Sequence, residues 1–227
     1  MNNKTSLMIA GAIAAAVAST ASGAVIAGWS MATAVAAGTV GSNYSYGAAN
    51  LGEQTADSML SGYHALATTA WSSPAGNGST YSLSSNGWTT SDYYQVACST
   101  AGYDGVSISW NQTRSGTGPA LFEVRMSSDG GATWSALGEY AVIQAGLAGT
   151  NTTSWNATTY QVAFDMSMAA AGANNSSSVL FRFSSKVTAA AAGTSRIDNI
   201  VVSGNMVPAP GALALLGVAG LLSRRRR

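Results

Sequence analysis

Apolar and polar residues alternate one by one along several short stretches of this chain, and this alternation limits the available folds more than any other feature. Between Val179 and Val187, the odd-numbered positions include Phe181 and Phe183, whereas the even-numbered positions include Arg182. Successive side chains of a β-strand point to opposite faces of a sheet. The pattern therefore predicts a strand with one face in the core and the other in solvent.

Ten stretches qualify as short strands, separated by turns rich in Gly, Ser and Asn, and no segment between them has convincing helical periodicity. They are Val25–Met31, Ala65–Thr69, Thr80–Ser84, Asp92–Ser99, Gly105–Asn111, Ala120–Ser127, Ala136–Ile143, Tyr160–Met166, Ser178–Val187 and Arg196–Ser203. Many short strands without helices predict an all-β fold in which two antiparallel sheets form a sandwich. A jelly roll is the preferred topology.

The composition disfavours several classes of function. Only 19 of the 227 residues are charged, and four of the ten basic residues form an arginine cluster at the C-terminus. Residues 24–206 keep five basic and nine acidic residues, a net charge of −4 that disfavours nucleic acids and other polyanionic partners. The single Cys98 excludes an internal disulfide, and the single His64 disfavours zinc sites and His-activated nucleophiles.

The N-terminus has the features of a secretory signal peptide. Lys4 precedes an apolar stretch from Leu7 to Val17, and small residues follow it up to Gly23. The stretch is too short for a permanent transmembrane helix, and the small residues suit cleavage by a signal peptidase near Gly23 or Ala24. We therefore expect residues 1–23 to be a signal helix. The alternative is a buried N-terminal helix.

The C-terminus has three parts in a fixed order. Val207, Pro208, Ala209 and Pro210 are followed by an apolar stretch over 211–222 and by Arg224, Arg225, Arg226 and Arg227. Twelve helical residues rise only ~18 Å against a hydrocarbon core of ~30 Å, so this short transmembrane helix would be a marginal anchor. Positive charges stay on the cytoplasmic side, which would place the chain between the two ends outside the cell. The alternative is a C-terminal helix of the globular domain.

This tripartite tail resembles the PEP-CTERM sorting signal of Gram-negative and related bacteria, which is also called the ice-binding protein C-terminal domain. The resemblance implies export, transient retention in the inner membrane, cleavage near the Pro-x-Pro motif by an exosortase, and release to the cell surface or extracellular matrix. It divides the chain into residues 1–23, a β-sandwich domain over 24–206, and a sorting tail over 207–227. One departure is Ala209, where the family usually has glutamate.

One predicted hairpin matches the Asp-box pattern at Ser127, Asp129, Gly131, Thr133 and Trp134. The aspartate can accept amide hydrogen bonds across the turn, glycines can adopt positive φ, and the tryptophan can fold back over the loop. The hairpin resembles those of sialidases and other glycan-active proteins, where the box is structural. A single box and four arginines in the domain argue against a sialidase, so we expect a structural role here too.

A second resemblance covers residues 60–204. The segments Gly87–Tyr94, Ser115–Pro119 and Arg196–Val202, together with the Asp-box hairpin, resemble the jelly-roll body common among PEP-CTERM proteins. Similar closing strands occur in galactose-binding-like and other lectin-type sandwiches. The resemblance implies a fold more than an activity, because such folds host many functions.

Three tryptophans fall in expected loops and are candidates for a glycan-binding platform: Trp71, Trp88 and Trp155. Sugar rings pack on exposed aromatic faces, but the same side chains could instead cap the ends of the sandwich. His64 is expected on the surface or in a loop, and Cys98 is expected to be a small buried apolar residue.

No catalytic residue and no required cofactor is expected. Asp198 is the first candidate ligand for a structural Ca²⁺, with a hydrogen bond to a neighbouring N-terminal strand as the alternative. Three functions stay open at this point. The first is a non-enzymatic structural or adhesive component of the cell surface or matrix, in contact with exopolysaccharide. The second is a lectin-like carbohydrate-binding module, and the third is a secreted glycan hydrolase, which would need two converging carboxylates.

Overall fold

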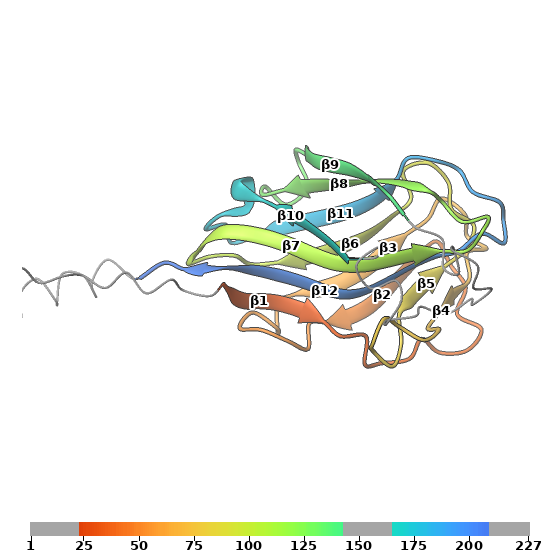
Figure 1. Cartoon of the computed structure of the whole chain (residues 1–227), viewed down its shortest axis with the longest axis horizontal. Helices are drawn as coiled ribbons and strands as arrows, with labels where there is room; N and C mark the ends of the chain where they lie inside the picture. The colour runs from red at the N-terminus through yellow and green to blue at the C-terminus, as the bar shows by residue number, and fades with distance from the viewer. Residues whose placement is uncertain (1–22, 143–164, 209–227) are drawn as a thin grey trace, which may run out of the picture.

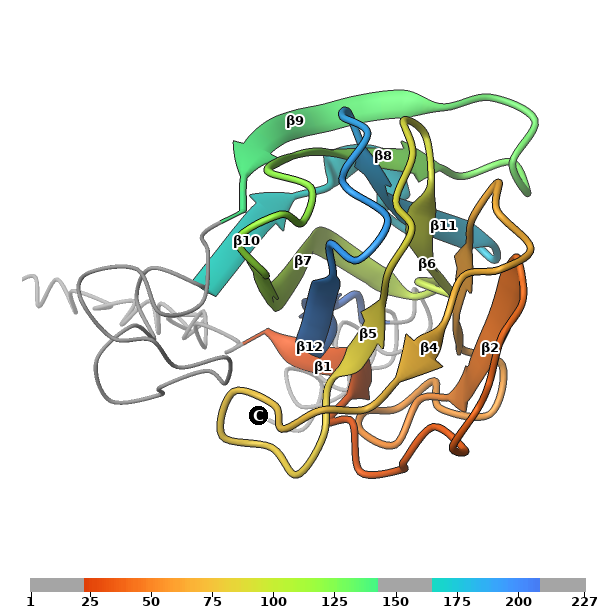
Figure 2. The same ribbon diagram turned by 90° about the vertical axis from the view of Figure 1, so that its right-hand side faces the viewer.

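A computed structural model describes residues 23–142 and 165–208 as two antiparallel β-sheets packed face to face (Figure 1). The first sheet has the order β10-β7-β12-β5-β4, and β1 also pairs with β12. Its strands are β1 (Ala24–Trp29), β4 (Trp71–Ser72), β5 (Leu83–Ser85), β7 (Tyr103–Arg114), β10 (Asp165–Ala169) and β12 (Ser195–Met206). Figure 2, which looks along the strands, separates this layer from the second sheet.

The second sheet has the order β2-β3-β6-β11-β8-β9. Its strands are β2 (Asn43–Ala48), β3 (Met59–Tyr63), β6 (Tyr93–Cys98), β8 (Leu121–Ser127), β9 (Ser135–Ala141) and β11 (Val179–Ser185), and a short 3-10 helix, η1, spans Ala171–Ala173. The predicted sandwich of two antiparallel sheets is therefore confirmed. The jelly-roll winding remains a prediction.

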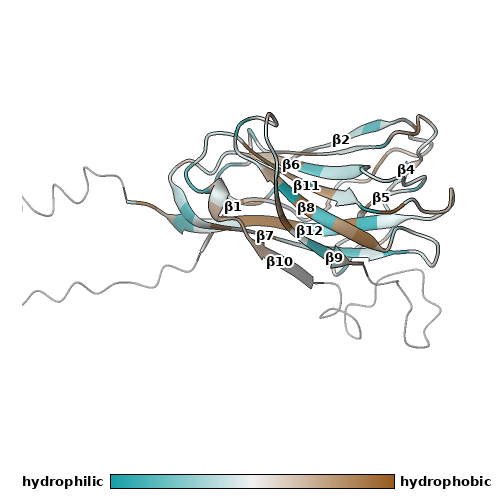
Figure 3. Ribbon diagram, turned by 90° about the horizontal axis from the view of Figure 1, so that it is seen from above, coloured by the Kyte–Doolittle hydropathy of each residue, from teal (hydrophilic) through white to brown (hydrophobic). Residues whose placement is uncertain are grey.

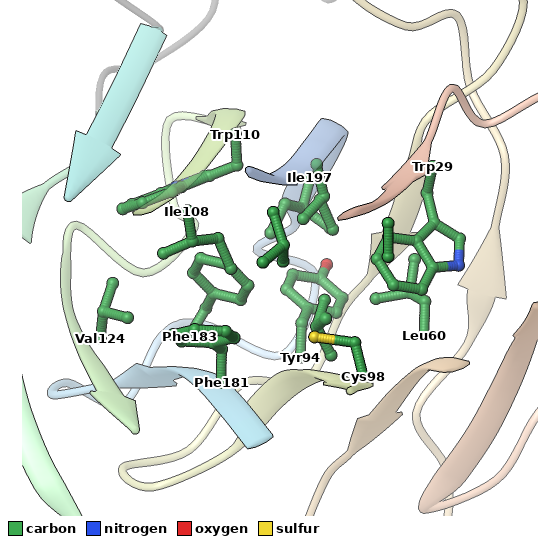
Figure 4. Packing of buried hydrophobic residues seen from close by; sticks show 14 of the residues in the cluster. Trp29, Leu60, Tyr94, Cys98, Ile108, Trp110, Val124, Phe181, Phe183 and Ile197 are labelled. Carbon is green, nitrogen blue, oxygen red and sulfur yellow. The ribbon is translucent and has the colours of Figure 1, made fainter. Parts of the chain in front are cut away.

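The core lies between the two sheets and consists of the inward residues of each alternating strand. Val179, Phe181 and Phe183 of β11 are fully buried, as their alternation predicts. Figure 4 shows Phe181 and Phe183 pointing toward Ile108 and Trp110 of β7. Figure 3 shows hydrophilic and hydrophobic residues mixed along the strands, as expected where only one side of a strand faces the core. Burial of each large apolar side chain stabilises the fold by about 1.5–3 kcal/mol.

Strand β12 is the last strand in the sequence but lies inside the first sheet. It pairs with β7 along one edge, and with β5 and β1 along the other. Ala24 lies opposite Gly204, so the first and last strands run side by side. Both described ends of the chain consequently lie at the same end of the sandwich (Figure 1).

Most predicted strands have a counterpart, with two kinds of exception. No strand forms over 65–69. Strands β2 and β3 were not predicted because they are short and contain Ser, Gly and Tyr, and β4 was not predicted because it has only two residues. The predicted strand Tyr160–Met166 overlaps β10 at Asp165 and Met166, and its residues 160–164 lie outside the described residues. The expected signal helix and C-terminal transmembrane helix fall almost entirely on 1–22 and 209–227, which also lie outside them. Over residues 23–142 and 165–208, no helix has the length and apolar character to cross a bilayer.

Candidate functional site

The candidate site lies on the side of the second sheet that points away from the core, which we call the outer face. Strand register aligns one row of outward residues across all six strands: Asn43, Tyr63, Tyr93, Ser184, Glu123 and Glu139. At a strand spacing of about 4.8 Å, the row is about 24 Å long. These residues are far apart in the sequence, and only the strand order brings them together.

Three aromatic rings and one guanidinium form a continuous stack on the outer face. The rings of Tyr63 and Tyr93 stack with centroids 5.4 Å apart and an interplanar angle of 26°. The Arg182 Cζ atom lies 4.1 Å from the Tyr93 ring centroid and 4.0 Å from that of Trp134. Cation–π contacts of this kind hold the guanidinium in place. Tyr63, at the end of the stack, is 40% exposed and keeps a ring available to a ligand.

A hydrogen bond at the edge of the guanidinium also limits the movement of Arg182. Its Nε donates a hydrogen bond to Oε1 of Gln95, on the neighbouring strand β6, at 2.7 Å. Partial burial lowers the pKa of Arg182, but an arginine remains charged at neutral pH. A fixed cation on an otherwise polar surface loses little conformational entropy when it binds a ligand.

A pocket of about 460 Å³ opens beside this stack. In the cross-strand row, the small Ser184 lies between Tyr93 and Glu123, and all three residues line the pocket. Other polar and charged lining residues are Thr90, Ser91, Arg125, Arg182 and Lys186. The volume lies within the range of sites for small ligands.

Charged side chains around the pocket are arranged in pairs. Lys186 Nζ lies 2.9 Å from Oε1 of Glu139 and 3.9 Å from Oε1 of Glu123, and Arg125 Nε lies 3.6 Å from Oε2 of Glu123. The hydrogen bond to Glu139 and the charges of both glutamates raise the pKa of Lys186. Such exposed pairs contribute little to stability, but they set the charge pattern that a ligand meets.

The Asp-box hairpin between β8 and β9 supplies one ring of the stack. Asp129 accepts hydrogen bonds from the Ser127 hydroxyl (2.7 Å), the Thr133 amide (2.9 Å) and the Thr133 hydroxyl (2.5 Å). The hydrogen bonds from Thr133 and Ser127 hold the pKa of Asp129 well below its usual value. Gly131 has a φ of 97°, and its carbonyl accepts the indole N–H of Trp134 at 3.0 Å. Besides its place in this turn, Trp134 packs against Arg182, a contact that the local pattern does not reveal.

The expected tryptophan platform needs correction. Trp71 and Trp88 are 3% and 0% exposed and pack in the core, so neither presents a ring to a ligand. A Cβ on Gly62 of β3 would lie 2.4 Å from Cη2 of Trp71, so the space for this indole exists only because residue 62 has no side chain. Trp155 lies outside the described residues.

His64, expected on the surface or in a loop, does lie in the loop after β3 but is fully buried, and the two ends of its ring contact polar groups. Its Nε2 lies 3.0 Å from the Ser85 hydroxyl, and its Nδ1 lies 3.2 Å from Oδ2 of Asp92. The order of groups matches a Ser-His-Asp triad. However, Ser85 and Asp92 are each 1% exposed, and the Ser85 hydroxyl also contacts that of Tyr94 at 3.1 Å. A substrate could not reach this serine, so the arrangement is a polar network within the core.

Asp198 is also part of a buried network rather than an open ligand. Its carboxylate accepts hydrogen bonds from the amides of Asn77 (2.6 Å) and Asn199 (2.7 Å) and from the Ser79 hydroxyl (2.6 Å). Its partners therefore lie mainly in the loop before β5, not in the N-terminal strand. Burial outweighs these hydrogen bonds and raises the pKa of Asp198 to about 6. Cys98 is 4% exposed, and burial raises the pKa of its thiol to about 12.

A structural Ca²⁺ at Asp198 stays a prediction. Within the described ranges, no group of three His, Cys, Asp or Glu residues is placed to hold a metal ion. In this structure the Asp198 carboxylate accepts hydrogen bonds from three donors, which satisfy a buried charged group and hold the loop before β5.

Comparisons with known proteins give no family. No family model and no curated protein matches the chain. Among solved structures, the K2 cleaved adhesin domain of Lys-gingipain is 11% identical with a TM-score of 0.40, over 70% of this chain and 97% of that one. The carbohydrate-binding module TmCBM61, in complex with β-1,4-galactotriose, is 10% identical with a TM-score of 0.39, over 66% and 90%. A family 11 carbohydrate-binding module of a cellulosomal cellulase from Clostridium thermocellum is 9% identical with a TM-score of 0.38, over 76% and 99%. At these values the similarities do not support an inference about function.

Proposed function

We propose that this protein is an exported, non-enzymatic jelly-roll sandwich that binds a carbohydrate of the cell surface or extracellular matrix through its outer face. The stack of Tyr63, Tyr93, Arg182 and Trp134 beside a polar pocket carries this proposal. Sugar rings offer apolar C–H faces and a rim of hydroxyls, so they bind where aromatic rings and fixed polar groups lie together. The outer face provides both in one place.

The carboxylates of the outer face favour binding over hydrolysis. Glu123 and Glu139 are opposite each other in neighbouring strands, but both contact Lys186. Glycoside hydrolysis needs one protonated and one free carboxylate on either side of the scissile bond. Two carboxylates that share one ammonium on the same sheet face do not have that arrangement.

A purely structural or adhesive role is the second candidate. The burial of Trp71 and Trp88 favours it, because these rings cap the core instead of forming a platform. The two candidates differ in one measurable property, since only the first requires the outer face to bind a sugar.

For location, we propose secretion through a signal peptidase and sorting by an exosortase after transient retention in the inner membrane. The sequence features at 1–23 and 207–227 support this proposal. The strands fit it, because β1 starts at Ala24 and β12 ends at Met206, so both expected cleavage sites lie outside the sandwich. Cutting at either place would leave every strand intact.

Processing at both ends can be measured directly. Mass spectrometry of the native protein is expected to give an N-terminus near Ala24 and a C-terminus near Pro208, without the arginine cluster. Intact Arg227 on protein recovered from the medium would contradict sorting by cleavage. Replacing Pro208 and Pro210 by alanine tests the motif, and the uncut form is then expected in the membrane fraction.

Replacing Tyr63 by alanine is expected to weaken carbohydrate binding by about 3- to 10-fold, because the stack loses its exposed ring. The full chain should first be screened on an array of bacterial exopolysaccharides, glucans, xylans and galactans, and the best glycan titrated by calorimetry. Val40→Ala is the matched control, since Val40 is 59% exposed and lies outside the outer face. Equal affinity of Tyr63→Ala and the parent chain would argue against this face, and no binding to any glycan would leave the structural role.

A further inference from the structure

Among the described residues, Arg182 is the cation of the outer face for which no ion pair with a carboxylate forms. Arg125 and Lys186 both contact Glu123, and Lys186 also contacts Glu139. Within residues 23–142 and 165–208, Arg182 makes one hydrogen bond, from its Nε to Gln95. The four N–H groups of its two terminal nitrogens are therefore available to a ligand.

The surroundings of Arg182 restrict the direction from which a ligand can approach. The rings of Tyr93 and Trp134 contact the guanidinium at 4.1 and 4.0 Å. Gln95 occupies the Nε position. A ligand can therefore approach only the edge of the guanidinium that carries the two terminal nitrogens. An edge of this kind binds a planar carboxylate through two parallel hydrogen bonds.

The charges of the pocket favour an anion as well. Three cations and one carboxylate line it, namely Arg125, Arg182, Lys186 and Glu123. Glu139, beside the pocket, also contacts Lys186, so the group as a whole keeps one net positive charge, which the unpaired Arg182 supplies. The three cations are three of the five basic residues of the domain, whose overall charge of −4 led us to disfavour polyanionic partners. The overall charge of the domain does not describe this face, because these three basic residues lie together on it. At short range, the local charge decides which ligand binds.

We propose that this pocket binds the carboxylate of a uronic acid unit in an acidic polysaccharide. The carboxylate pairs with the free edge of Arg182, and the sugar hydroxyls meet Ser184, Thr90 and Ser91, which also line the pocket. This inference deepens the carbohydrate binding proposed above and depends on it. It adds that the preferred sugar is acidic and that Arg182 recognises its charge.

The test uses the full chain and two probes with the same sugar backbone. Polygalacturonate carries a carboxylate on each unit, and its fully methyl-esterified form carries none; alginate and a polyglucuronate extend the series to other uronic acids. In affinity electrophoresis and calorimetry, at least one polyuronate is expected to bind at least 10-fold more tightly than its ester. This preference should decrease as salt is added.

Variants of Arg182 test the specific contact. Arg182→Gln is expected to lose about 10- to 100-fold in affinity for the polyuronate, the range for loss of charge-assisted hydrogen bonds. Arg182→Lys keeps the charge but not the paired donors, so it should also lose about 10-fold. Arg114→Gln changes the net charge by the same amount away from this face and should bind normally. Thermal unfolding of each variant separates lost binding from lost fold.

The outcomes separate this inference from the broader proposal. If neutral and acidic glycans bind equally well, and Arg182→Gln binds like the parent chain, carbohydrate binding stands and the acidic specificity is overturned. If no glycan binds, neutral or acidic, both proposals fail. If sulfated polysaccharide or duplex DNA binds as tightly as the polyuronate, the face attracts polyanions in general and recognition of a carboxylate is overturned.

Discussion

Replacing Trp88 by alanine is expected to lower the free energy of unfolding by about 3–5 kcal/mol, the usual cost of removing a fully buried tryptophan. The indole is 0% exposed and packs edge-on against His64, Tyr94 and Phe122, with ring centroids 4.3, 5.0 and 5.3 Å away. Its N–H donates to the Ser85 carbonyl at 2.9 Å. Alanine would leave a large cavity and one carbonyl without its donor. Urea unfolding of the full chain, followed by far-UV circular dichroism, measures the loss.

The control for this experiment is Trp134→Ala. Trp134 is partly exposed on the outer face, so its loss should reduce stability much less and reduce carbohydrate binding more. The two substitutions are thus expected to have different effects: Trp88→Ala mainly lowers stability, and Trp134→Ala mainly weakens binding. If Trp88→Ala unfolds like the parent chain but no longer binds glycan, Trp88 would be a ligand-binding residue of an exposed platform. That result would contradict its burial in the core.

Replacing Asp92 by alanine is expected to cost about 3–5 kcal/mol of stability, because removing this buried carboxylate leaves the groups that donate to it without an acceptor. Asp92 accepts the backbone N–H of Ala65 (2.8 Å) and of Thr89 (2.6 Å), and its Oδ2 lies 3.2 Å from His64 Nδ1. His64 and Ala65 directly follow β3, whereas Thr89 and Asp92 lie between β5 and β6, so the carboxylate ties these two loops together at one end of the core. Thermal unfolding and amide hydrogen exchange at Ala65 and Thr89 test this role.

The pH dependence gives a second readout of the same group. Burial alone would raise the pKa of Asp92, but the hydrogen bonds from His64, Thr89 and Ala65 outweigh it and lower the pKa below 3.8. The folded state therefore binds this proton less tightly than the unfolded state. The resulting stability is present above pH 3.8 and is lost as pH falls through the lowered pKa. Asp92→Asn should show a smaller loss than alanine and none of this acid dependence, whereas an unchanged acid profile would show that Asp92 does not control it.

The sequence alone could predict the strands in which alternation is strong. Phe181 and Phe183 alternate with Arg182, and this pattern fixes both the strand and its buried face. The pattern is much shorter in β2, where Tyr44 and Tyr46 alternate with Asn43 and Ser45 over only four residues before Gly47. There the strand forms because its neighbour β3 offers a free edge, which is a property of the folded sheet.

The candidate site was less predictable, because it depends on strand order. Tyr63, Tyr93 and Arg182 come from strands that are separated by up to 119 positions in the chain and meet only through the order β3-β6-β11. One local signal was available, since Tyr93 and Arg182 both occupy the polar side of their alternating strands. The burial of His64 also had no local signal, because its partners Ser85 and Asp92 follow 21 and 28 residues later.

The position of β12 inside the first sheet has a consequence for how the protein is made. The first strand synthesised, β1, can find its partner only when the last one, β12, has been completed. Contacts between such distant segments form late and slowly. In the export that we propose, the chain is threaded through a membrane channel, and closure of this sheet must then wait until nearly every residue has passed. A chaperone that shields the waiting strands would therefore raise the yield of native protein.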